Sequence, residues 1–235
     1  MNQQMLDVEI WRGGMSGHYN SYQVPIQARQ TILDIVTYVQ RELDSTLSYR
    51  FSCRVGMCGT CAMTVNGVPR WTCRTQTSVI SSRSGIRIAP LRNFPVIKDL
   101  VVDMNDFFEK WDRGMGASDQ EYSDSGQFAQ VRPDSAQRKA VDQAIECIGC
   151  GVCHAACDVV GWNPQYLGPA ALNRTWSLAN DERQQNRKAL LQWSATESGC
   201  LSCHTTRSCT TCCPKELDPS GSIAGLKQQI VRSLI

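Results

Sequence analysis

Alternating apolar and polar residues open the chain and predict a β-hairpin. Leu6, Val8 and Ile10 alternate with polar neighbours, as in a strand with one buried face. After the Gly13-Gly14 turn, residues 19–24 predict the returning strand. Further along, Arg87, Ile88 and Pro90 predict a last strand for this half.

Helical spacing follows the hairpin. Thr31 predicts an N-cap, and Asp34 three residues later completes a capping box. The apolar positions that follow at helical spacing are Ile32, Ile35, Val36, Val39 and Leu43. We expect this helix to pack in the core, and a later helix to carry Phe107, Phe108 and Trp111.

The second half of the chain has helical spacing throughout. Apolar positions predict helices from Ser135 to Cys147, over much of 169–193, and from Ser222 to Leu234. Between the halves, small and polar residues from Gly114 to Pro133 predict an exposed connection, either a plain surface loop or one that lies along a partner. We therefore expect an α+β protein with domains at 1–105 and 106–235.

Composition limits the possible functions. Thirteen cysteines in 235 residues is an odd number, and the N-terminus lacks the basic and apolar regions of a signal peptide. We expect reduced, metal-bound thiols in a reducing compartment. No stretch approaches 18 consecutive apolar residues, so we expect membrane association only through a partner. With 24 Lys and Arg spread among 22 Asp and Glu, no basic stripe suggests nucleic acid as a partner.

The first cysteine group predicts a 2Fe-2S cluster. Its members Cys53, Cys58, Cys61 and Cys73 follow the C-x4-C-x2-C pattern with a distant fourth cysteine, which is typical of plant-type ferredoxins. Asn66-Gly67 predicts a type I′ turn that brings Cys73 back to the loop. Gly56 and Gly59 allow positive φ, so that backbone N–H groups can approach the sulfurs. A zinc site is the alternative, but zinc prefers two separated C-x2-C pairs.

The second group predicts a 4Fe-4S cluster. Cys147, Cys150, Cys153 and Cys157 form the C-x2-C-x2-C-x3-C run of bacterial ferredoxins, in which the fourth cysteine ligates a neighbouring cluster. The ligand missing from the first three must come from elsewhere. Cys213 precedes a proline, as such runs usually end, so we expect it to complete this group.

The third group is short of one thiol. Counting back from Cys213 along the same pattern places Cys209 four residues earlier, Thr206 at the middle position and Cys203 at the first. A threonine hydroxyl is a poor iron ligand, so Cys157, Cys203 and Cys209 offer three thiolates, which suits a 3Fe-4S cluster. Cys200 and Cys212 are left over. If either entered this site through a shifted loop, the cluster would be 4Fe-4S instead.

At this point the sequence resembles a known family. The segments that carry the resemblance are SCRVGMCGTC, PVIKDLVVDM, ECIGCGVC, GWNP, GPAAL and the CCPK ending. In this order they resemble the iron–sulfur subunit of succinate dehydrogenase and fumarate reductase over nearly the whole chain. The resemblance implies a plant-type 2Fe-2S ferredoxin (β-grasp) domain followed by an all-α domain like bacterial ferredoxins.

The same resemblance implies partners and a place in the cell. In that family the ferredoxin domain contacts a flavoprotein subunit with bound FAD. The helical domain lies on a membrane anchor that binds quinone, often with haem b. Electrons then pass between flavin, 2Fe-2S, 4Fe-4S, 3Fe-4S and quinone, and the subunit is peripheral on the cytoplasmic or matrix face of the inner membrane. Fumarate reduction and succinate oxidation use the same order of clusters, so this predicts the assembly and not its direction.

The resemblance also assigns individual residues. Trp162 and His204 match family positions near the quinone, where an indole N–H and an imidazole can donate to an oxygen. The alternative is a packed Trp and a capping His. No catalytic residue is expected in this chain, because it holds no substrate itself. Asp158 stands where the family usually has Pro, and His154 is expected beside the iron ligands without being one.

Two other functions fit the cysteines. The chain could be a soluble multi-cluster ferredoxin with no fixed partner, although the apolar GWNP and GPAAL segments favour a fixed assembly. It could also belong to a related assembly with a thiol or disulfide substrate, which the surplus Cys200 and Cys212 suggest.

Overall fold

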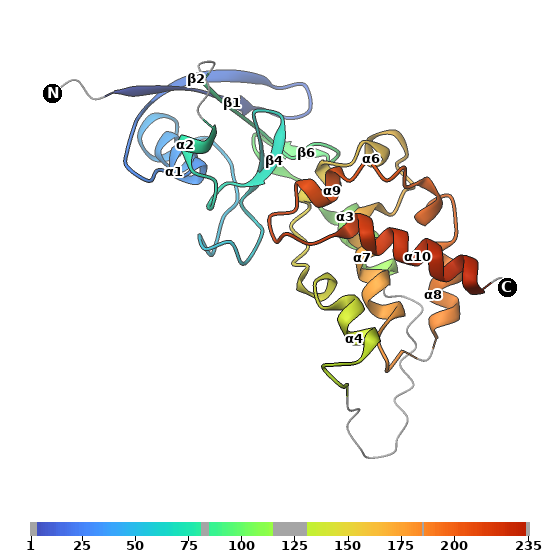
Figure 1. Ribbon diagram of the computed structural model, residues 1–235. Coiled ribbons are helices and arrows are strands. Elements are labelled where there is room, and N and C mark those ends of the chain that lie inside the picture. The colour runs from blue at the N-terminus through green and yellow to red at the C-terminus, as the bar shows by residue number, and fades with distance from the viewer. Residues whose placement is uncertain (1–3, 81–84, 115–130, 185, 234–235) are drawn as a thin grey trace, which may run out of the picture. The chain divides into compact units, whose positions relative to one another are not determined.

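The computed structural model describes residues 4–80, 85–114, 131–184 and 186–233. The chain forms two compact units (Figure 1). Unit 1 comprises Met1–Met104 together with Ile148–Ala156, and unit 2 comprises Asn105–Cys147 together with Cys157–Ile235. Most of the exposed connection predicted over 114–133 lies outside the described residues.

Unit 1 is built on a five-stranded mixed sheet with the strand order β2-β1-β5-β3-β4. Its strands are β1 (Met5–Arg12), β2 (His18–Pro25), β3 (Ala62–Val65), β4 (Val68–Trp71) and β5 (Ile86–Ala89). Strands β1 and β5 run parallel, and the other pairs are antiparallel. The predicted hairpin and last strand are therefore confirmed. The unit also contains a small ladder of β6 (Val96–Lys98) and β7 (Val101–Val102), and the short helices α2 (Thr77–Ile80) and α5 (Val152–Ala155).

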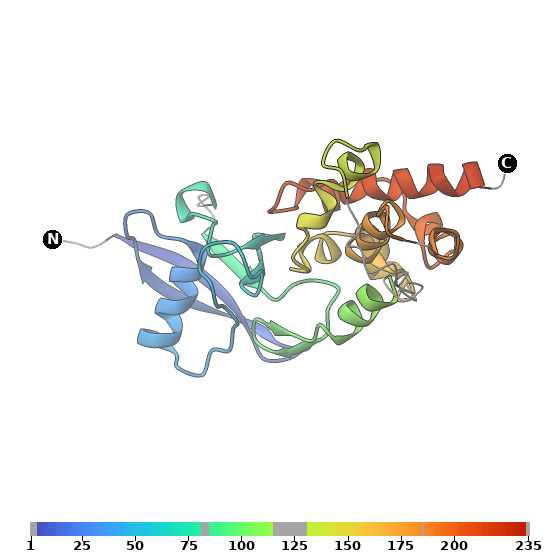
Figure 2. The ribbon, with the colours of Figure 1, turned by 90° about the horizontal axis from the view of Figure 1, so that it is seen from below.

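Helix α1 (Ile32–Tyr38) begins where the sequence predicted. The Thr31 hydroxyl accepts from the N–H of Asp34, and the Asp34 carboxylate accepts from the N–H of Thr31, which completes the capping box. A π-helical segment, η1 (Val39–Leu43), continues the helix. Figure 2 shows α1 against one face of the sheet. The shared core contains Val8, Ile10, Val24, Ile32, Ile35, Val36, Val39, Leu47, Met63, Val65, Ile86, Ile88 and Leu100.

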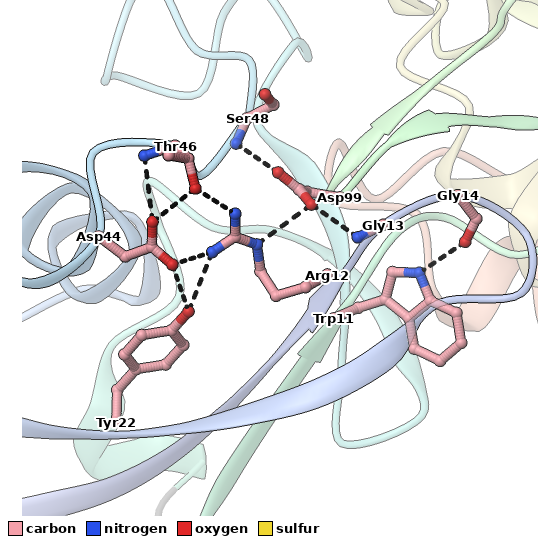
Figure 3. A network of polar contacts seen from close by, with 9 residues as sticks. All are labelled: Trp11, Arg12, Gly13, Gly14, Tyr22, Asp44, Thr46, Ser48 and Asp99. Atoms are coloured by element: carbon pink, nitrogen blue, oxygen red, sulfur yellow. Dashed lines mark hydrogen bonds and ion pairs between the residues drawn. The ribbon is translucent and has the colours of Figure 1, made fainter.

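A charged residue ends the buried face of β1. Arg12 follows Val8 and Ile10 on the same side of the strand, and its side chain is 11% exposed (Figure 3). Its guanidinium donates to the hydroxyl oxygens of Tyr22 over 3.0 Å and Thr46 over 2.7 Å, and it pairs with Asp44. A further N–H donates to Asp99 over 3.1 Å.

Asp99 connects this guanidinium to the backbone. The carboxylate is almost fully buried and accepts from the N–H groups of Gly13 over 2.7 Å and Ser48 over 2.8 Å. Burial alone would raise the pKa of Asp99, but these hydrogen bonds and the Arg12 charge outweigh it and lower that pKa. The buried ion pair is thus satisfied on all sides, and it holds three loops to the sheet.

Unit 2 is helical. Its longer helices are α3 (Asn105–Arg113), α7 (Gly168–Ala179), α8 (Arg187–Ser194) and α10 (Pro219–Ser233), and its short ones are α4 (Ala136–Val141), η2 (Ala144–Glu146), α6 (Asp158–Trp162), η3 (Cys200–Ser202) and α9 (Ser208–Thr211). Helices α7 and α10 lie side by side (Figure 1). Leu172, Leu191, Ile223 and Leu226 are buried in the core that these two helices share with α8. Among the described residues, no helix is long and apolar enough to cross a bilayer.

Three of the expected helices differ from the structure. The helix expected over much of 169–193 is two helices, because the Asp181 carboxylate accepts from the N–H of Arg183 and forms a turn after α7. The last helix begins three residues before Ser222, since Asp218 accepts from the N–H of Gly221 and caps it. The helix expected from Ser135 is present only as α4, with the 3₁₀ turn η2 before Cys147.

Replacing Arg12 tests the buried network. In Arg12→Met, Asp99 keeps its backbone donors but loses its counter-ion, and we expect the free energy of unfolding to fall by about 3 kcal/mol. Urea denaturation followed by circular dichroism measures this loss. The matched control is Arg87→Met, which breaks the exposed pair with Glu9 and should cost less than about 1 kcal/mol. Equal midpoints for the two variants would contradict the role assigned to Arg12.

Candidate iron–sulfur cluster sites

Three cysteines of the first group, Cys53, Cys58 and Cys61, lie on a loop of unit 1 whose backbone N–H groups donate to the Cys53 sulfur. The Cys53 sulfur accepts N–H groups from Met57 at 3.2 Å, Cys58 at 3.3 Å and Val55 at 3.5 Å. These hydrogen bonds, that of Val55 foremost, lower the pKa of the Cys53 thiol to about 6. Since the thiolate is the form that binds metal, the loop favours the metal-binding form of Cys53 before any iron is added.

The rest of this group is brought in by the β3–β4 hairpin. Val65 pairs with Val68 across Asn66 and Gly67, both of which have positive φ, so the predicted type I′ turn is confirmed. The strand leaving the turn ends next to Cys61.

Thr72 holds the fourth cysteine of this group in place. It donates both its N–H and its hydroxyl to the Cys61 carbonyl, at 3.3 and 2.8 Å. Burial, and next the Cys61 thiol, raise the pKa of Cys73 to about 11, while the N–H of Gly56 acts in the opposite direction. The loop and the hairpin therefore place Cys73 beside Cys61 and Gly56, as a shared cluster requires.

Part of the second group packs on this same loop within unit 1. Gly59 has φ +72°, and a Cβ built on it would lie 2.6 Å from the Cβ of Cys150. Only glycine allows this approach. Gly149 and Gly151 also have positive φ, so the backbone turns sharply on each side of Cys150.

Two residues from another part of unit 1, Asn93 and Phe94, hold the segment that carries Cys150 and Cys153. Asn93 donates to the carbonyl of His154 over 3.1 Å, and the ring of Phe94 packs on the His154 ring with centroids 4.8 Å apart. His154 is almost fully buried, consistent with a place beside the predicted ligands.

The other two members of the second group belong to unit 2. Lys215, two residues after Cys213, pairs with Glu146, which precedes Cys147, at 3.6 Å. The Asn173 side chain donates to the carbonyl of Ala144 over 3.0 Å and so fixes the turn before Cys147. Unit 2 thereby brings the segments around Cys147 and Cys213 together, although they are far apart in sequence.

The third group lines a hollow inside unit 2. Cys157, Cys203 and Cys209 border a space of about 310 Å³ that no protein atom fills and that is partly open to solvent. Its other lining residues are Val159, Tyr166, Pro169, His204, Thr205, Thr206, Arg207, Ser220 and Ile223. Thr206, predicted to stand where a fourth cysteine would be, faces the same hollow.

The thiols around this hollow keep their protons more firmly than free cysteines do. Burial raises the pKa of Cys157, although the N–H groups of Val160 and Val159 act in the opposite direction by donating to its sulfur. Burial, and next the nearby Cys157, raise the pKa of Cys209 to about 12. Thiols held this way exchange their protons for metal only when iron offsets the buried charge, so binding of iron would release protons.

The two surplus cysteines have different surroundings. Cys200 is fully buried in the apolar core of unit 2, and burial raises its pKa to about 11. Cys212 is partly exposed in the turn after α9.

The two residues predicted near a quinone, Trp162 and His204, have different surroundings. His204 is exposed and borders the hollow of the third group. Trp162 lies at the end of α6 with 77% of its surface exposed. Asp158 is exposed at the first position of α6, directly after Cys157.

Within the described part of the chain, no three His, Cys, Asp or Glu side chains converge on one point that could hold a single metal ion. In an iron–sulfur cluster the cysteines bind different iron atoms, so their sulfurs surround a volume and do not meet at a point. The third group, whose three cysteines border one hollow, has that form.

Comparisons with known proteins agree with this arrangement. A family model described as a 2Fe-2S iron-sulfur cluster binding domain matches residues 7–109, and one described as a 4Fe-4S dicluster domain matches residues 143–217. The fumarate reductase iron-sulfur subunit of Mycobacterium tuberculosis is 36% identical over 215 residues, covering 89% of this chain and 84% of that protein.

A eukaryotic relative and a solved structure extend the comparison. The mitochondrial succinate dehydrogenase (ubiquinone) iron-sulfur subunit 1 of Oryza sativa is 36% identical over 216 residues, covering 90% of this chain and 75% of that protein. A chain in the structure of the Mycobacterium smegmatis Sdh1 complex in the apo form has the same fold. It aligns with a TM-score of 0.84 at 24% identity, over 98% of this chain and 97% of that one.

Sequence reasoning missed some residues of the third site. Tyr166 is almost fully buried and lines the hollow, and burial, followed by the surrounding thiols, raises its pKa. Thr205 and Arg207 have φ of 59° and 62°, so the loop reverses on both sides of Thr206. The only local signal for Tyr166 was its position just after the GWNP segment, and nothing in the sequence marked the two left-handed residues.

Substituting Gly59 tests the close approach to Cys150. In Gly59→Ala, the left-handed backbone costs about 1–2 kcal/mol, and the new methyl group also clashes with Cys150. We expect reduced 2Fe-2S content, measured from the visible absorption and iron content of the purified protein.

The control for Gly59→Ala is Gly67→Ala. Gly67 has φ +80°, and a Cβ there meets nothing within 4 Å, so this variant carries the backbone cost without the clash. It should retain its clusters. If the two variants lose the same amount of cluster, the packing of Gly59 on Cys150 is unimportant.

Proposed function

The chain belongs to the family of iron–sulfur subunits of fumarate reductase and succinate dehydrogenase, and we propose that it passes electrons between the FAD of a flavoprotein subunit and membrane quinone. It is thus a subunit of an oxidoreductase complex. The clusters, when bound, supply one-electron carriers. This chain's own residues hold them, shield them and set the polarity around them.

We assign the ligands as three sets. Cys53, Cys58, Cys61 and Cys73 would hold the 2Fe-2S cluster; Cys147, Cys150, Cys153 and Cys213 would hold the 4Fe-4S cluster; and Cys157, Cys203 and Cys209 would hold a 3Fe-4S cluster. The hydrogen bonds at Cys53 and the packing of Gly59 on Cys150 support the first two sets. That packing would also keep the first two clusters near each other, since it joins the loop of one to the loop of the other.

Exposed apolar residues beside these sites support the proposed partners. In the first loop Val55 and Met57 are 59% and 64% exposed, a surface that we assign to the flavoprotein subunit. In unit 2, Trp162 and Leu201 are 77% and 59% exposed close in sequence to the third group, and we assign them to one or more membrane anchor subunits, with or without haem b. Through these partners the chain would lie on the cytoplasmic or matrix face of the inner membrane.

The third cysteine group lies beside the residues that we expect to contact the quinone. Cys157, Cys203 and Cys209 border one hollow, and Thr206 lines it too. His204 borders the same hollow, where its imidazole can donate to a quinone oxygen. Cys200 is buried in apolar core, which argues against its use in thiol or disulfide chemistry and favours the quinone reading.

The third cluster is tested by its magnetism. Oxidised 3Fe-4S is paramagnetic, whereas oxidised 2Fe-2S and 4Fe-4S are silent, so air-oxidised protein should give a near-stoichiometric EPR signal. In Thr206→Cys the new thiolate completes a four-cysteine set, and we expect that signal to fall by most of its intensity while the iron content rises by one atom per chain.

Thr205→Cys is the matched control, because it adds a thiol to the same lining one residue away. It should keep the wild-type signal. A silent spectrum from fully loaded wild-type protein, or equal effects of the two substitutions, would overturn the 3Fe-4S assignment. Recovery of the chain from a gentle membrane extract without a flavoprotein would instead favour a free ferredoxin.

A further inference from the structure

The loop of the first cysteine group presents a guanidinium that is stacked on aromatic rings. Arg54 directly follows Cys53, and its guanidinium carbon lies 4.7 Å from the centroid of the Phe51 ring. Phe51 in turn stacks on Tyr49, with ring centroids 5.4 Å apart and an angle of 13° between the planes. The Tyr49 hydroxyl donates to the Thr37 hydroxyl oxygen over 3.2 Å, and its ring packs on the core of unit 1. The stack therefore connects Arg54 to that core.

The position of Arg54 leaves its N–H groups available to a partner. Its φ is 59°, in the left-handed region that residues other than glycine seldom adopt. Stacking covers the face of a guanidinium and leaves the N–H groups free at its edge, where their planar fork matches a carboxylate. Arg54 is exposed, and within the part of the chain that the structure describes no carboxylate pairs with it.

A second stacked guanidinium in unit 1 shows what such a group binds. Arg87 lies over the Tyr19 ring at the same distance, 4.7 Å, and pairs with the Glu9 carboxylate over 2.6 Å. Arg54 has the same kind of aromatic platform without the carboxylate. The group that completes this site would therefore be a carboxylate of another molecule.

The sequence around the loop contains no acid that could take this place. Residues 45–98 contain seven arginines and one lysine but no aspartate or glutamate, although the whole chain has a net charge of only +2. The acids that border this stretch, Asp44 and Asp99, both pair with Arg12. A surface with this charge attracts an acidic partner and repels a second copy of itself.

Exposed apolar side chains lie on the same loop as this cation. Phe51, Val55 and Met57 are 38%, 59% and 64% exposed. Aromatic residues, methionine and arginine are enriched at the centre of protein interfaces. We propose that the face formed by Phe51, Arg54, Val55 and Met57 binds an acidic site on the flavoprotein subunit, where one carboxylate accepts two hydrogen bonds from Arg54. This inference rests on the proposed function, which assigns the loop to that subunit.

The test is the Kd between the flavoprotein subunit and the cluster-loaded full chain, measured by biolayer interferometry at low and high salt. Arg54→Gln should raise Kd about 30-fold or more, because the carboxylate of the partner is then buried without its counter-ion. It should also weaken the salt dependence of the association rate. Arg87→Gln is the matched control, because that guanidinium already pairs with Glu9, and it should leave Kd unchanged.

A second variant tests the stack itself. Phe51→Leu keeps the Arg54 charge and all four cysteines but removes the aromatic platform, and it should raise Kd about two- to fivefold. Iron content and the EPR signal of the reduced 2Fe-2S cluster check that each variant is loaded. Because Phe51→Leu leaves the residue next to Cys53 unchanged, it keeps the proposal falsifiable if Arg54→Gln loads poorly.

A zero-length crosslink identifies the chemistry of the partner group. Arg54→Lys places an amine on the loop, and a carbodiimide joins an amine to a neighbouring carboxylate as an amide. In the complex we expect a crosslink from this position to an Asp or Glu of the flavoprotein subunit, found by mass spectrometry of the digested product. Arg87→Lys is the control, and its amine should join Glu9 of its own chain.

The outcomes separate this inference from the proposed function. An unchanged Kd in loaded Arg54→Gln, or a crosslink that does not reach the flavoprotein subunit, would overturn the role of Arg54 while the cluster assignment stands. A shifted 2Fe-2S potential without a change in Kd would assign Arg54 to the cluster, and binding to phosphatidylserine vesicles that Arg54→Gln abolishes would assign it to a lipid; either would overturn the proposal. A loaded wild-type chain that does not bind the flavoprotein subunit would overturn the proposed function and this inference with it.

Discussion

A sulfur anion inside a protein needs hydrogen-bond donors, and this requirement shapes the chain around each cysteine group. The donors available are backbone N–H groups, which point at a sulfur only if the chain turns sharply. The first loop turns at Gly56 and Gly59, the second at Gly149 and Gly151, and the third at Thr205 and Arg207. The helices and strands fix the ends of these turns, so the arrangement of these elements determines which N–H groups can reach the sulfurs.

The two units hold their turns by different means. Unit 1 uses a hydrogen-bonded sheet, in which the β3–β4 hairpin carries Cys61 and Cys73 at its two ends. Unit 2 has no described strand, and lysine side chains that are partly or fully buried hold the loops by their carbonyl groups instead. Lys227 of α10 donates to the carbonyl of Cys203 over 2.8 Å, and Lys110 of α3 donates to that of Pro164 over 2.6 Å. Such contacts fix a loop with no strand beside it.

The parts of the fold that depend on local pattern could be predicted from the sequence. Thr31 with Asp34 marked the start of α1, and Asn66-Gly67 marked the hairpin. The cysteine spacings predicted which thiols share a group, although the ligand sets stay predictions. The remaining features depend on residues that are distant in sequence. Arg12 donates to Asp99, 87 residues away, and no local pattern predicts that pairing. The Thr210–Asp218 contact was missed for the same reason, because it forms only when α9 meets α10.

The path of the chain between the units affects how the protein can be made. The chain passes from one unit to the other at 104/105, 147/148 and 156/157, so no single cut releases either unit whole. A fragment ending at residue 104 would expose the surfaces of Gly59 and Phe94 that Cys150 and His154 cover. During synthesis, the strands of unit 1 leave the ribosome long before the segment that completes their unit. Unit 1 is therefore complete only after residues 148–156 have been made, and a fragment that ends at residue 104 lacks part of its own unit.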